Sequence, residues 1–492
     1  MVTHAQERLA QPEPSGPAPG AGVRDERAER EALIRLLRET PPELIAAAGE
    51  RDTVLAFRRA ASLVPSYRAL LAARGVRAED VVDMDSFRRL VPLLDKHLTF
   101  GAHSIADLAV GGSLSEARSV LTSSGHSGVF SFGVNTRVNQ ETSAQSIDTG
   151  LQYLFRVDER RTLLINCLPM GVKVHTRATV IAETSVRDDM VYALIKKFGP
   201  EFDQIILVGE GSFIKKIVED GEAHHGIEWP KVPVHIITGE EGIAENYRTY
   251  LAARLGIADM SAPDSRLIGS SMGVAELDLN IFHETRETIA IRRRAHADPA
   301  LRAALFGADA RVCPMLFVYY PHRCTVETTA TDELVISMLS AHMHIPLLRY
   351  RAGDLGRVYG YGEMVDLLAA RGVGTAPDLK LPFVAVAGRG KALEAADGRL
   401  TPEEVKEALY HDHGLAQAAT GNFYLTRTKA GRARIDVQLR RGVKRPKDGE
   451  ARLADALTRY SAVTPERIVL RPYREFPVAM ELDYERKFRY VG

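Results

Sequence analysis

Cysteine is scarce in this sequence. The 492 residues include three cysteines, Cys167, Cys313 and Cys324, and no two of them form a CxxC pair. An odd set of widely spaced cysteines argues against a disulfide framework and against a zinc site, and it is typical of a reducing compartment. We therefore predict a cytoplasmic protein.

Long apolar runs and a net charge are also missing. No apolar stretch approaches the roughly 20 residues that a membrane-spanning helix needs, so we expect no membrane association. Lysine plus arginine equals aspartate plus glutamate, 64 against 64, which gives no electrostatic reason to expect nucleic acid as a partner. Residues 1–25 are rich in Ala, Pro and Gly and lack the apolar core of a signal peptide, so they are expected to form a disordered tail.

The apolar periodicity predicts an α/β fold. Helical spacing dominates the first part of the chain, and from about residue 160 short apolar runs alternate with helical patterns, which indicates a parallel sheet. After two glycines that flank Arg389, a helix–strand–helix–strand alternation predicts a small α+β module. We expect a large N-terminal domain with parallel sheets over residues 26–388, joined by a hinge to a small mobile domain over residues 389–492.

A cluster of small polar residues stands out in the stretch TSSGHSG. Ser, Thr and Gly let the backbone turn tightly and offer N–H and O–H donors to a polyphosphate. No GK[ST] follows, so this is not a Walker A sequence, and a plain loop is the alternative interpretation. The cluster consists of Thr122, Ser123, Ser124, Gly125, His126, Ser127 and Gly128.

A formal serine-hydrolase motif is present in GSSMG, with Ser271 in the nucleophile position. A nucleophile elbow needs a strand before it and a helix directly after it. Here the strand-like segment VAELDLNIF follows, so the hydrolase stays a distant alternative.

Acidic residues occur at three further places where a nucleotide could bind. Asp354 in RYRAGD could accept hydrogen bonds from two vicinal hydroxyl groups, because an ionised carboxylate only accepts. Gly239 and Glu240 end a predicted strand, where ligands bind in α/β folds. Glu276 follows the turn at Gly273 and is suited to Mg²⁺. Each position also has an ordinary loop interpretation.

The order of these motifs resembles that of the adenylate-forming, acyl-CoA synthetase-like superfamily. The resemblance is strongest to the phenylacetate–CoA ligase branch and to the acyl-protein synthetase of bacterial luminescence. It covers about residues 30–492 and rests on six stretches in sequence order: TSSGHSG, TGEEG, SMGVAE, RYRAGD, AGRGK and ERKFRY.

The resemblance implies a role for each matched residue. Thr122 to Gly128 would cradle the β and γ phosphates of ATP, with His126 standing where the family usually has a hydroxyl residue. Gly239, Glu240, Met272 and Gly273 would bind adenine, Asp354 would bind the ribose, and Glu276 would bind Mg²⁺. Arg389 would lie at a hinge near the nucleotide, and Lys487 would bridge the acyl carboxylate and the α-phosphate. His175 and Arg177 would contact the acyl substrate.

The implied activity is ATP-dependent activation of a small-molecule carboxylate. An acyl-adenylate would form with release of pyrophosphate, and the acyl group would pass to CoA, an acyl-carrier protein or an amine. Val129 and Phe130 stand where the family usually has Lys-Pro, so the loop loses a cation. A nucleotide-binding regulator with weakened adenylation therefore stays open as an alternative. A relative that transfers AMP itself, with no acyl acceptor, is a further alternative, and the sequence indicates no oligomeric state.

Overall fold

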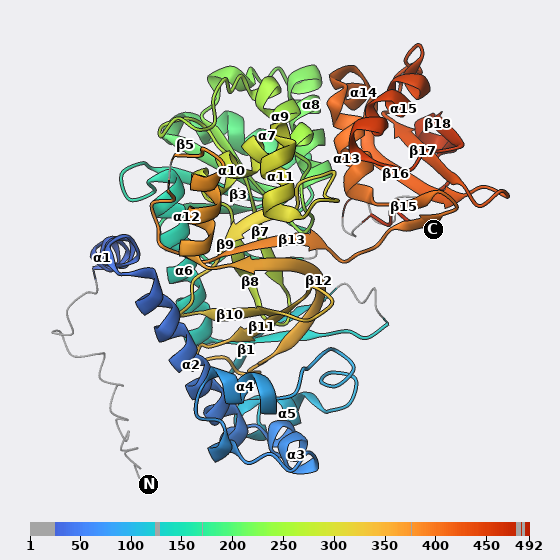
Figure 1. Cartoon of the computed structure of the whole chain (residues 1–492). Coiled ribbons are helices and arrows are strands. Elements are labelled where there is room, and N and C mark those ends of the chain that lie inside the picture. Colours follow the sequence, from blue (N-terminus) through green and yellow to red (C-terminus); the bar gives the residue numbers. More distant parts are fainter. Residues whose placement is uncertain (1–24, 124–127, 170, 375, 479–483, 485–487) are drawn as a thin grey trace, which may run out of the picture.

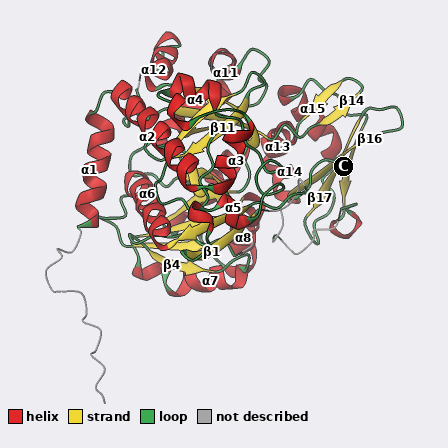
Figure 2. Cartoon of the chain, turned by 90° about the horizontal axis from the view of Figure 1, so that it is seen from below, coloured by secondary structure: helices red, strands yellow, loops and turns green. Residues whose placement is uncertain are grey.

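The computed structural model describes residues 25–123, 128–169, 171–374, 376–478, 484 and 488–492 (Figures 1 and 2). Its helices are α1 Glu26–Glu39, α2 Pro42–Leu63, α3 Pro65–Ala73, α4 Met84–Leu90, α5 Ile105–Leu108, α6 Arg137–Phe155, α7 Asp188–Lys197, α8 Gly211–His225, α9 Glu245–Leu255, α10 Arg286–Ala297, α11 Pro299–Phe306, α12 Tyr361–Ala370, α13 Pro402–His411, α14 His413–Ala418 and α15 Gly449–Tyr460. Its strands are β1 Ala117–Thr122, β2 Phe132–Thr136, β3 Thr162–Asn166, β4 Val180–Glu183, β5 Gln204–Glu210, β6 Val234–Gly239, β7 Ile268–Val274, β8 Asp278–His283, β9 Met315–Val318, β10 Cys324–Thr328, β11 Glu333–Met338, β12 Tyr350–Tyr359, β13 Phe383–Gly388, β14 Leu393–Ala395, β15 Gly398–Leu400, β16 Ala419–Arg427, β17 Ala433–Leu439 and β18 Arg467–Arg471.

One sheet of eleven strands organises the larger part of the chain. Its order is β10-β11-β12-β13-β9-β8-β7-β6-β5-β3-β4. The half that contains β3 to β7 is parallel, as the strand–helix alternation predicts. The half from β8 to β13 is antiparallel. The α/β fold class is confirmed, and the sheet is mixed.

Helices cover both faces of the parallel half. Alternate residues of β5 enter two different cores: Ile205 and Leu207 pack with α8 and α9, whereas Ile206 and Val208 pack with α6. A strand that is buried on both faces reads as a continuous apolar run, which is why β3 and β5 were recognisable in the sequence.

The C-terminal segment forms its own layer of helix and sheet. β16, β17 and β18 make a three-stranded sheet, and α13, α14 and α15 pack around it (Figure 1, orange to red). A separate apolar core runs from Leu393 to Leu470. This core agrees with a small α+β module, and the boundary between residues 388 and 389 stays a prediction.

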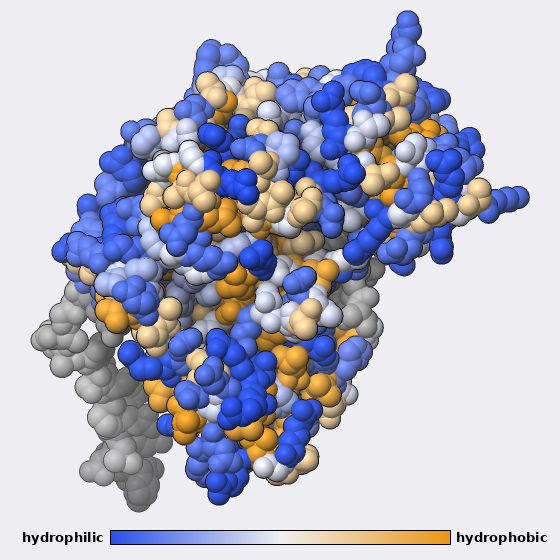
Figure 3. Space-filling view, viewed as in Figure 1, coloured by the Kyte–Doolittle hydropathy of each residue, from blue (hydrophilic) through white to orange (hydrophobic). Residues whose placement is uncertain are grey.

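Hydrophilic residues predominate on the face seen in Figure 3, where apolar residues lie in small groups. Among the described residues, none of the helices combines the length and apolar character that crossing a bilayer requires.

The close approach of β12 and β13 predicts a stability effect at Gly356. A Cβ atom there would lie 2.2 Å from the carbonyl oxygen of Ala385, so Gly356→Ala must push two paired strands apart. We expect the free energy of unfolding to fall by about 1–3 kcal/mol. Urea denaturation measures it. The matched control is Gly362→Ala on α12, where a Cβ atom meets nothing and should stabilise the helix by about 0.5–1 kcal/mol. An unchanged Gly356→Ala protein would contradict the strand contact.

Candidate active site

The predicted phosphate loop is the connection of a two-stranded hairpin. β1 and β2 pair antiparallel with Thr122 opposite Phe132, and the Ser123 N–H donates to the Ser131 carbonyl at 2.9 Å. The Ser131 N–H donates in turn to the Ser123 hydroxyl oxygen at 3.0 Å. Gly128 has a φ of 82°, which glycine adopts readily. Five predicted site residues lie outside the described residues: Ser124, Gly125, His126, Ser127 and Lys487.

Glu276 lies in a tight turn between β7 and β8, directly beside this hairpin. The N–H of Leu277 donates to the carbonyl of Val274 at 2.8 Å and closes the turn. A Cβ atom on Gly133 of β2 would lie 2.1 Å from the carbonyl oxygen of Ala275. Only glycine allows this approach, so the hairpin and the glutamate turn are held together.

The Glu276 carboxylate is 2% exposed, and two side chains of the described part of the chain contact it. The hydroxyl of Tyr350 donates to Oε1 at 2.8 Å, and Lys96 Nζ lies 3.8 Å from the same oxygen. Burial, reinforced by Glu276, raises the pKa of Tyr350 well above its ordinary value, so the phenol stays a donor. Tyr350 belongs to the RYRAGD motif, whereas no sequence motif marks Lys96.

The metal role predicted for Glu276 fits only a cation that also binds phosphates. Among the described residues, no group of three or more His, Cys, Asp or Glu side chains could hold a metal ion. Mg²⁺ is ordinarily bound through one or two carboxylates together with substrate phosphates. One buried carboxylate beside the hairpin agrees with that arrangement.

Asp354 and Arg389 lie close together where β12 and β13 pair. Arg389 Nε is 3.7 Å from Asp354 Oδ1, and Asp354 is 6% exposed. Gly388 and Gly390 have φ values of 77° and 62°, so the chain turns sharply on both sides of Arg389. Asp354 also follows Tyr350 by four residues on the same strand, which brings the predicted ribose ligand to the neighbourhood of the glutamate turn.

The predicted adenine residues lie along two neighbouring parallel strands. Gly239 ends β6, and Glu240 follows it with a φ of 73°, which is uncommon for a residue other than glycine. β6 pairs in parallel with β7, which carries the half-buried Met272 and the exposed Gly273. The strand ends therefore share the edge at which ligands bind in α/β folds.

The same strand rules out a nucleophile elbow at Ser271. Ser271 lies inside β7, opposite His283 in the antiparallel strand β8, and no helix follows it directly. An elbow needs a strand–turn–helix arrangement, so the distant hydrolase alternative is wrong.

The predicted substrate residues lie on the loop after β3. The Arg177 guanidinium donates to Glu26 of α1 at 2.6 Å, and its backbone N–H donates to Asp148 at 2.9 Å. Its side chain is 47% exposed, and His175 is partly exposed. A cavity of about 100 Å³ lies between α6 and the parallel half of the sheet, and neither His175 nor Arg177 lines it. A role of His175 and Arg177 in substrate binding stays a prediction.

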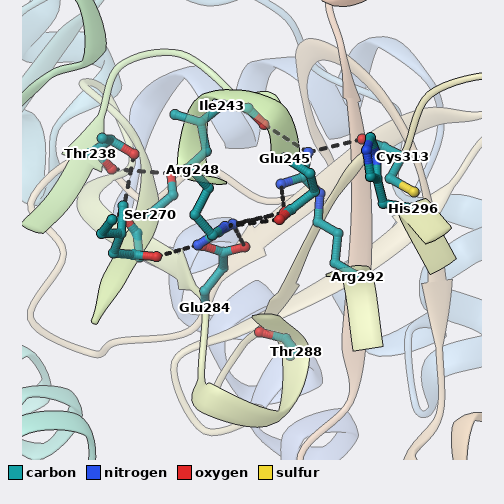
Figure 4. Close-up of polar contacts among 12 residues, drawn as sticks. Thr238, Ile243, Glu245, Arg248, Ser270, Glu284, Thr288, Arg292, His296 and Cys313 are labelled. Carbon is teal, nitrogen blue, oxygen red and sulfur yellow. Dashed lines mark hydrogen bonds and ion pairs between the residues drawn. The ribbon is translucent and has the colours of Figure 1, made fainter. Parts of the chain in front are cut away.

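A buried charge cluster lies near the ends of β6 and β7 (Figure 4). It consists of Glu245, Arg248, Glu284 and Arg292. Arg248 Nη2 lies 2.7 Å from Glu284 and 3.1 Å from Glu245, and Arg292 also pairs with Glu245. Burial opposes the charge on Glu245, but the two guanidinium groups outweigh it and lower the pKa of that carboxyl. Each of the four charges therefore has a partner of opposite sign, and removing one of them would leave another buried and unpaired.

The C-terminal module contacts the same cluster through α13. Glu407 accepts hydrogen bonds from the backbone N–H groups of Glu245 at 2.8 Å and Asn246 at 3.0 Å, which begin α9. Lys406 forms an ion pair with Glu241 at 2.8 Å. Burial raises the pKa of Glu407 to about 7 despite the two N–H donors. Lys406 and Glu407 could not be identified as functional residues from the sequence, because the charged sequence of α13 is typical of a solvent-exposed helix.

Known structures share this arrangement of elements. No family model matches the sequence, and no curated protein matches it. Solved structures of 2-hydroxyisobutyryl-CoA ligase match over nearly the whole chain. The chain has the fold of this ligase. The structure of that ligase in the postadenylation state, in complex with 2-HIB-AMP, matches this chain with a TM-score of 0.66 and 12% sequence identity. The match covers 93% of this chain and 91% of the ligase chain. The structure of the same ligase in the thioesterification state, in complex with 2-HIB-AMP and CoA, matches with a TM-score of 0.53 and 11% sequence identity, again over 93% of this chain and 91% of the ligase chain.

The pKa of Glu407 predicts a pH-dependent contact between α13 and α9. Because the pKa in the folded protein lies above the ordinary value of 4.5, the folded state binds more protons between these two values. Stability from this group is complete below pH 4.5 and is lost as the pH rises through about 7. We expect Glu407→Gln to remove this decline, measured as the midpoint of thermal unfolding between pH 5 and pH 8.

The exposed Glu394→Gln serves as the matched control and should retain the slope of the parent protein. An identical pH slope for Glu407→Gln and the parent would contradict the assignment.

Proposed function

We propose that this protein is an ATP-dependent carboxylate-activating ligase. It would form an acyl-adenylate, release pyrophosphate and transfer the acyl group to CoA or to another thiol or amine acceptor. The observation that carries the proposal is the meeting of three motifs far apart in sequence. Gly133 brings the hairpin against the Glu276 turn, and Tyr350 links that turn to the strand that carries Asp354.

The fold supports the same activity. The solved 2-hydroxyisobutyryl-CoA ligase carries 2-HIB-AMP, and in one state also CoA. Similarity to its postadenylation state, at a TM-score of 0.66, exceeds similarity to its thioesterification state, at 0.53. This difference supports a module that rotates about a hinge at Arg389 between two half-reactions, starting from the conformation described above.

The chemistry needs donors and positive charge where anions meet. A carboxylate oxygen of the substrate attacks the α-phosphorus of ATP, the bond to the β-phosphate oxygen breaks, and pyrophosphate leaves with that electron pair. The thiol or amine then attacks the acyl carbon, and AMP leaves. Fixed donors aimed at the developing charge lower such barriers most, and holding the reactants in line supplies the remainder.

Residues of this chain can fill each role. The hydroxyl groups of Thr122 and Ser123 would bind phosphate oxygens, and Asp354 would accept the ribose hydroxyls. Glu276 would hold Mg²⁺, whose charge would offset that of the phosphates. Lys96 would supply the cation that the loop lacks at Val129, because it lies 3.8 Å from Glu276. Lys487 would bridge the carboxylate and the α-phosphate.

Within the superfamily, the motif order favours the phenylacetate–CoA ligase-like branch. CoA is the simplest acceptor, and an acyl-carrier protein or an amine would need only a different surface. The second candidate is a nucleotide-binding regulator, which the missing loop lysine favours, and an AMP transferase is a further alternative. Cytoplasmic location stays a prediction.

The test is ATP–pyrophosphate exchange across a panel of aryl, fatty and amino acids. We expect exchange that depends on one class of acid and that falls by roughly 10²–10³-fold in Lys487→Ala, since a charge-stabilising group at the reacting atoms is lost. Asp354→Ala should raise the KM for ATP. Lys429→Ala, an exposed lysine on the same module, is the matched control and should retain full exchange.

ATP binding without exchange for any acid would overturn the ligase and support the regulator. ATP binding with transfer of AMP to a non-carboxylate acceptor would support the AMP transferase.

A further inference from the structure

A cavity of about 100 Å³ lies between α6 and the parallel half of the sheet. Most of its wall is apolar and includes Leu151, Leu164 and Val208. Cores seldom contain voids larger than one water molecule, and the share of one water in the liquid is about 30 Å³. A hollow of this size with a mainly apolar lining is a candidate binding site for a small molecule.

The cavity adjoins the candidate nucleotide site. Leu168 lines it and also lies 3.3 Å from the position that a Cβ atom on Gly239 would occupy. Ser271, on the opposite wall, directly precedes Met272. α6 itself begins at the residue after the hairpin strand β2. A ligand in the cavity therefore lies between the predicted adenine residues and the helix that follows the phosphate loop.

Two buried polar atoms lie together at one side of the cavity: His283 lines it, and Tyr320 packs against His283. His283 is 5% exposed and Tyr320 is 2% exposed, and among the described residues neither His283 Nε2 nor the Tyr320 hydroxyl has a hydrogen-bond partner. The two rings lie side by side, with centroids 5.2 Å apart. Buried polar groups are nearly always satisfied, so this adjacent pair is suited to hydrogen bonds with a polar group of a bound molecule.

Gly150 of α6 leaves the space in front of this pair open. A Cβ atom on Gly150 would lie 3.9 Å from both His283 Nε2 and the Tyr320 hydroxyl. Glycine in the middle of a helix costs about 0.5–1 kcal/mol relative to alanine, although alanine would fit here. Close packing therefore does not require glycine at position 150, and the glycine leaves the space in front of His283 and Tyr320 open.

The wall carries no unbalanced charge. Among the described residues that line the cavity, Glu284 alone is charged, and it is paired with Arg248 in the charge cluster of Figure 4. Burial, together with Arg323, lowers the pKa of His283 to about 4, so its ring is neutral and offers one donor and one acceptor. A second carboxylate or a phosphate on the substrate would find no cation here.

We propose that this cavity binds the acyl part of the substrate and selects a compact, apolar carboxylic acid that carries one uncharged hydroxyl group. The body of the acid is no larger than a single ring, since a cavity of roughly 150 Å³ accommodates benzene and this one measures about 100 Å³. Its hydroxyl meets His283 and Tyr320, and its carboxylate points to the nucleotide. The choice of substrate rests on the proposed ligase function.

The experiment measures binding and exchange separately. Isothermal titration with benzoate, 3- and 4-hydroxybenzoate, 4-hydroxyphenylacetate and terephthalate precedes exchange assays with the same acids. We expect at least one hydroxylated acid to bind the parent protein roughly tenfold or more tightly than benzoate, and terephthalate not to bind. Tyr320→Phe should abolish that preference and leave benzoate binding unchanged. Gly150→Ala should weaken binding of the preferred acid and leave thermal stability equal or higher.

Gly362→Ala on α12 is the matched control and should bind as the parent does. Exchange with acids whose binding neither Gly150→Ala nor Tyr320→Phe changes would overturn the cavity assignment and leave the ligase intact. Binding as expected without any exchange would support the cavity and contradict the ligase. Failure of every acid in the panel to bind the parent, or equal binding of benzoate and all three hydroxylated acids, would overturn the substrate class.

Discussion

The buried charge cluster around Arg248 constrains the rest of the molecule. A buried charge that loses its partner costs about 3–5 kcal/mol, so Glu245, Glu284 and Arg292 must keep their positions relative to Arg248. Glu284 is also part of the cavity wall, Arg292 donates to the carbonyl of Ile243 in the loop after β6, and the first N–H groups of α9 are bound by the C-terminal module. One set of ion pairs thus fixes the cavity, the predicted adenine edge and the module contact together.

Much of the fold could be predicted from the sequence, because local patterns determine it. The buried strands β3, β5 and β6 read as apolar runs, and α7 and α8 as amphipathic helices between them. The antiparallel half of the sheet was harder to foresee. Its strands β8 to β11 have four to six residues each, and such short segments do not reveal the direction of their neighbours.

Some residues of the candidate site could likewise be predicted from the sequence, and others could not. Glu276, Asp354 and Arg389 lie in glycine-containing turns or motifs that are visible in a single sequence. Lys96 and Glu407 belong to segments without any motif, and only tertiary structure brings them to Glu276 and to α9. His283 and Tyr320 read as ordinary strand residues in the sequence, because an unsatisfied buried atom is a property of the packing around it.

The proposed phosphate loop lacks the lysine that the resemblance implies, and another segment places a cation near the Glu276 turn. The hairpin lacks a lysine at Val129, but Lys96 enters the same neighbourhood from the segment after α4. The ring of Phe100 packs against Phe132 with centroids 6.1 Å apart, which keeps that segment beside the hairpin. A cation on a packed segment is held more rigidly than one on a loop tip. The site therefore retains positive charge close to Glu276, where phosphates and Mg²⁺ would have to be balanced.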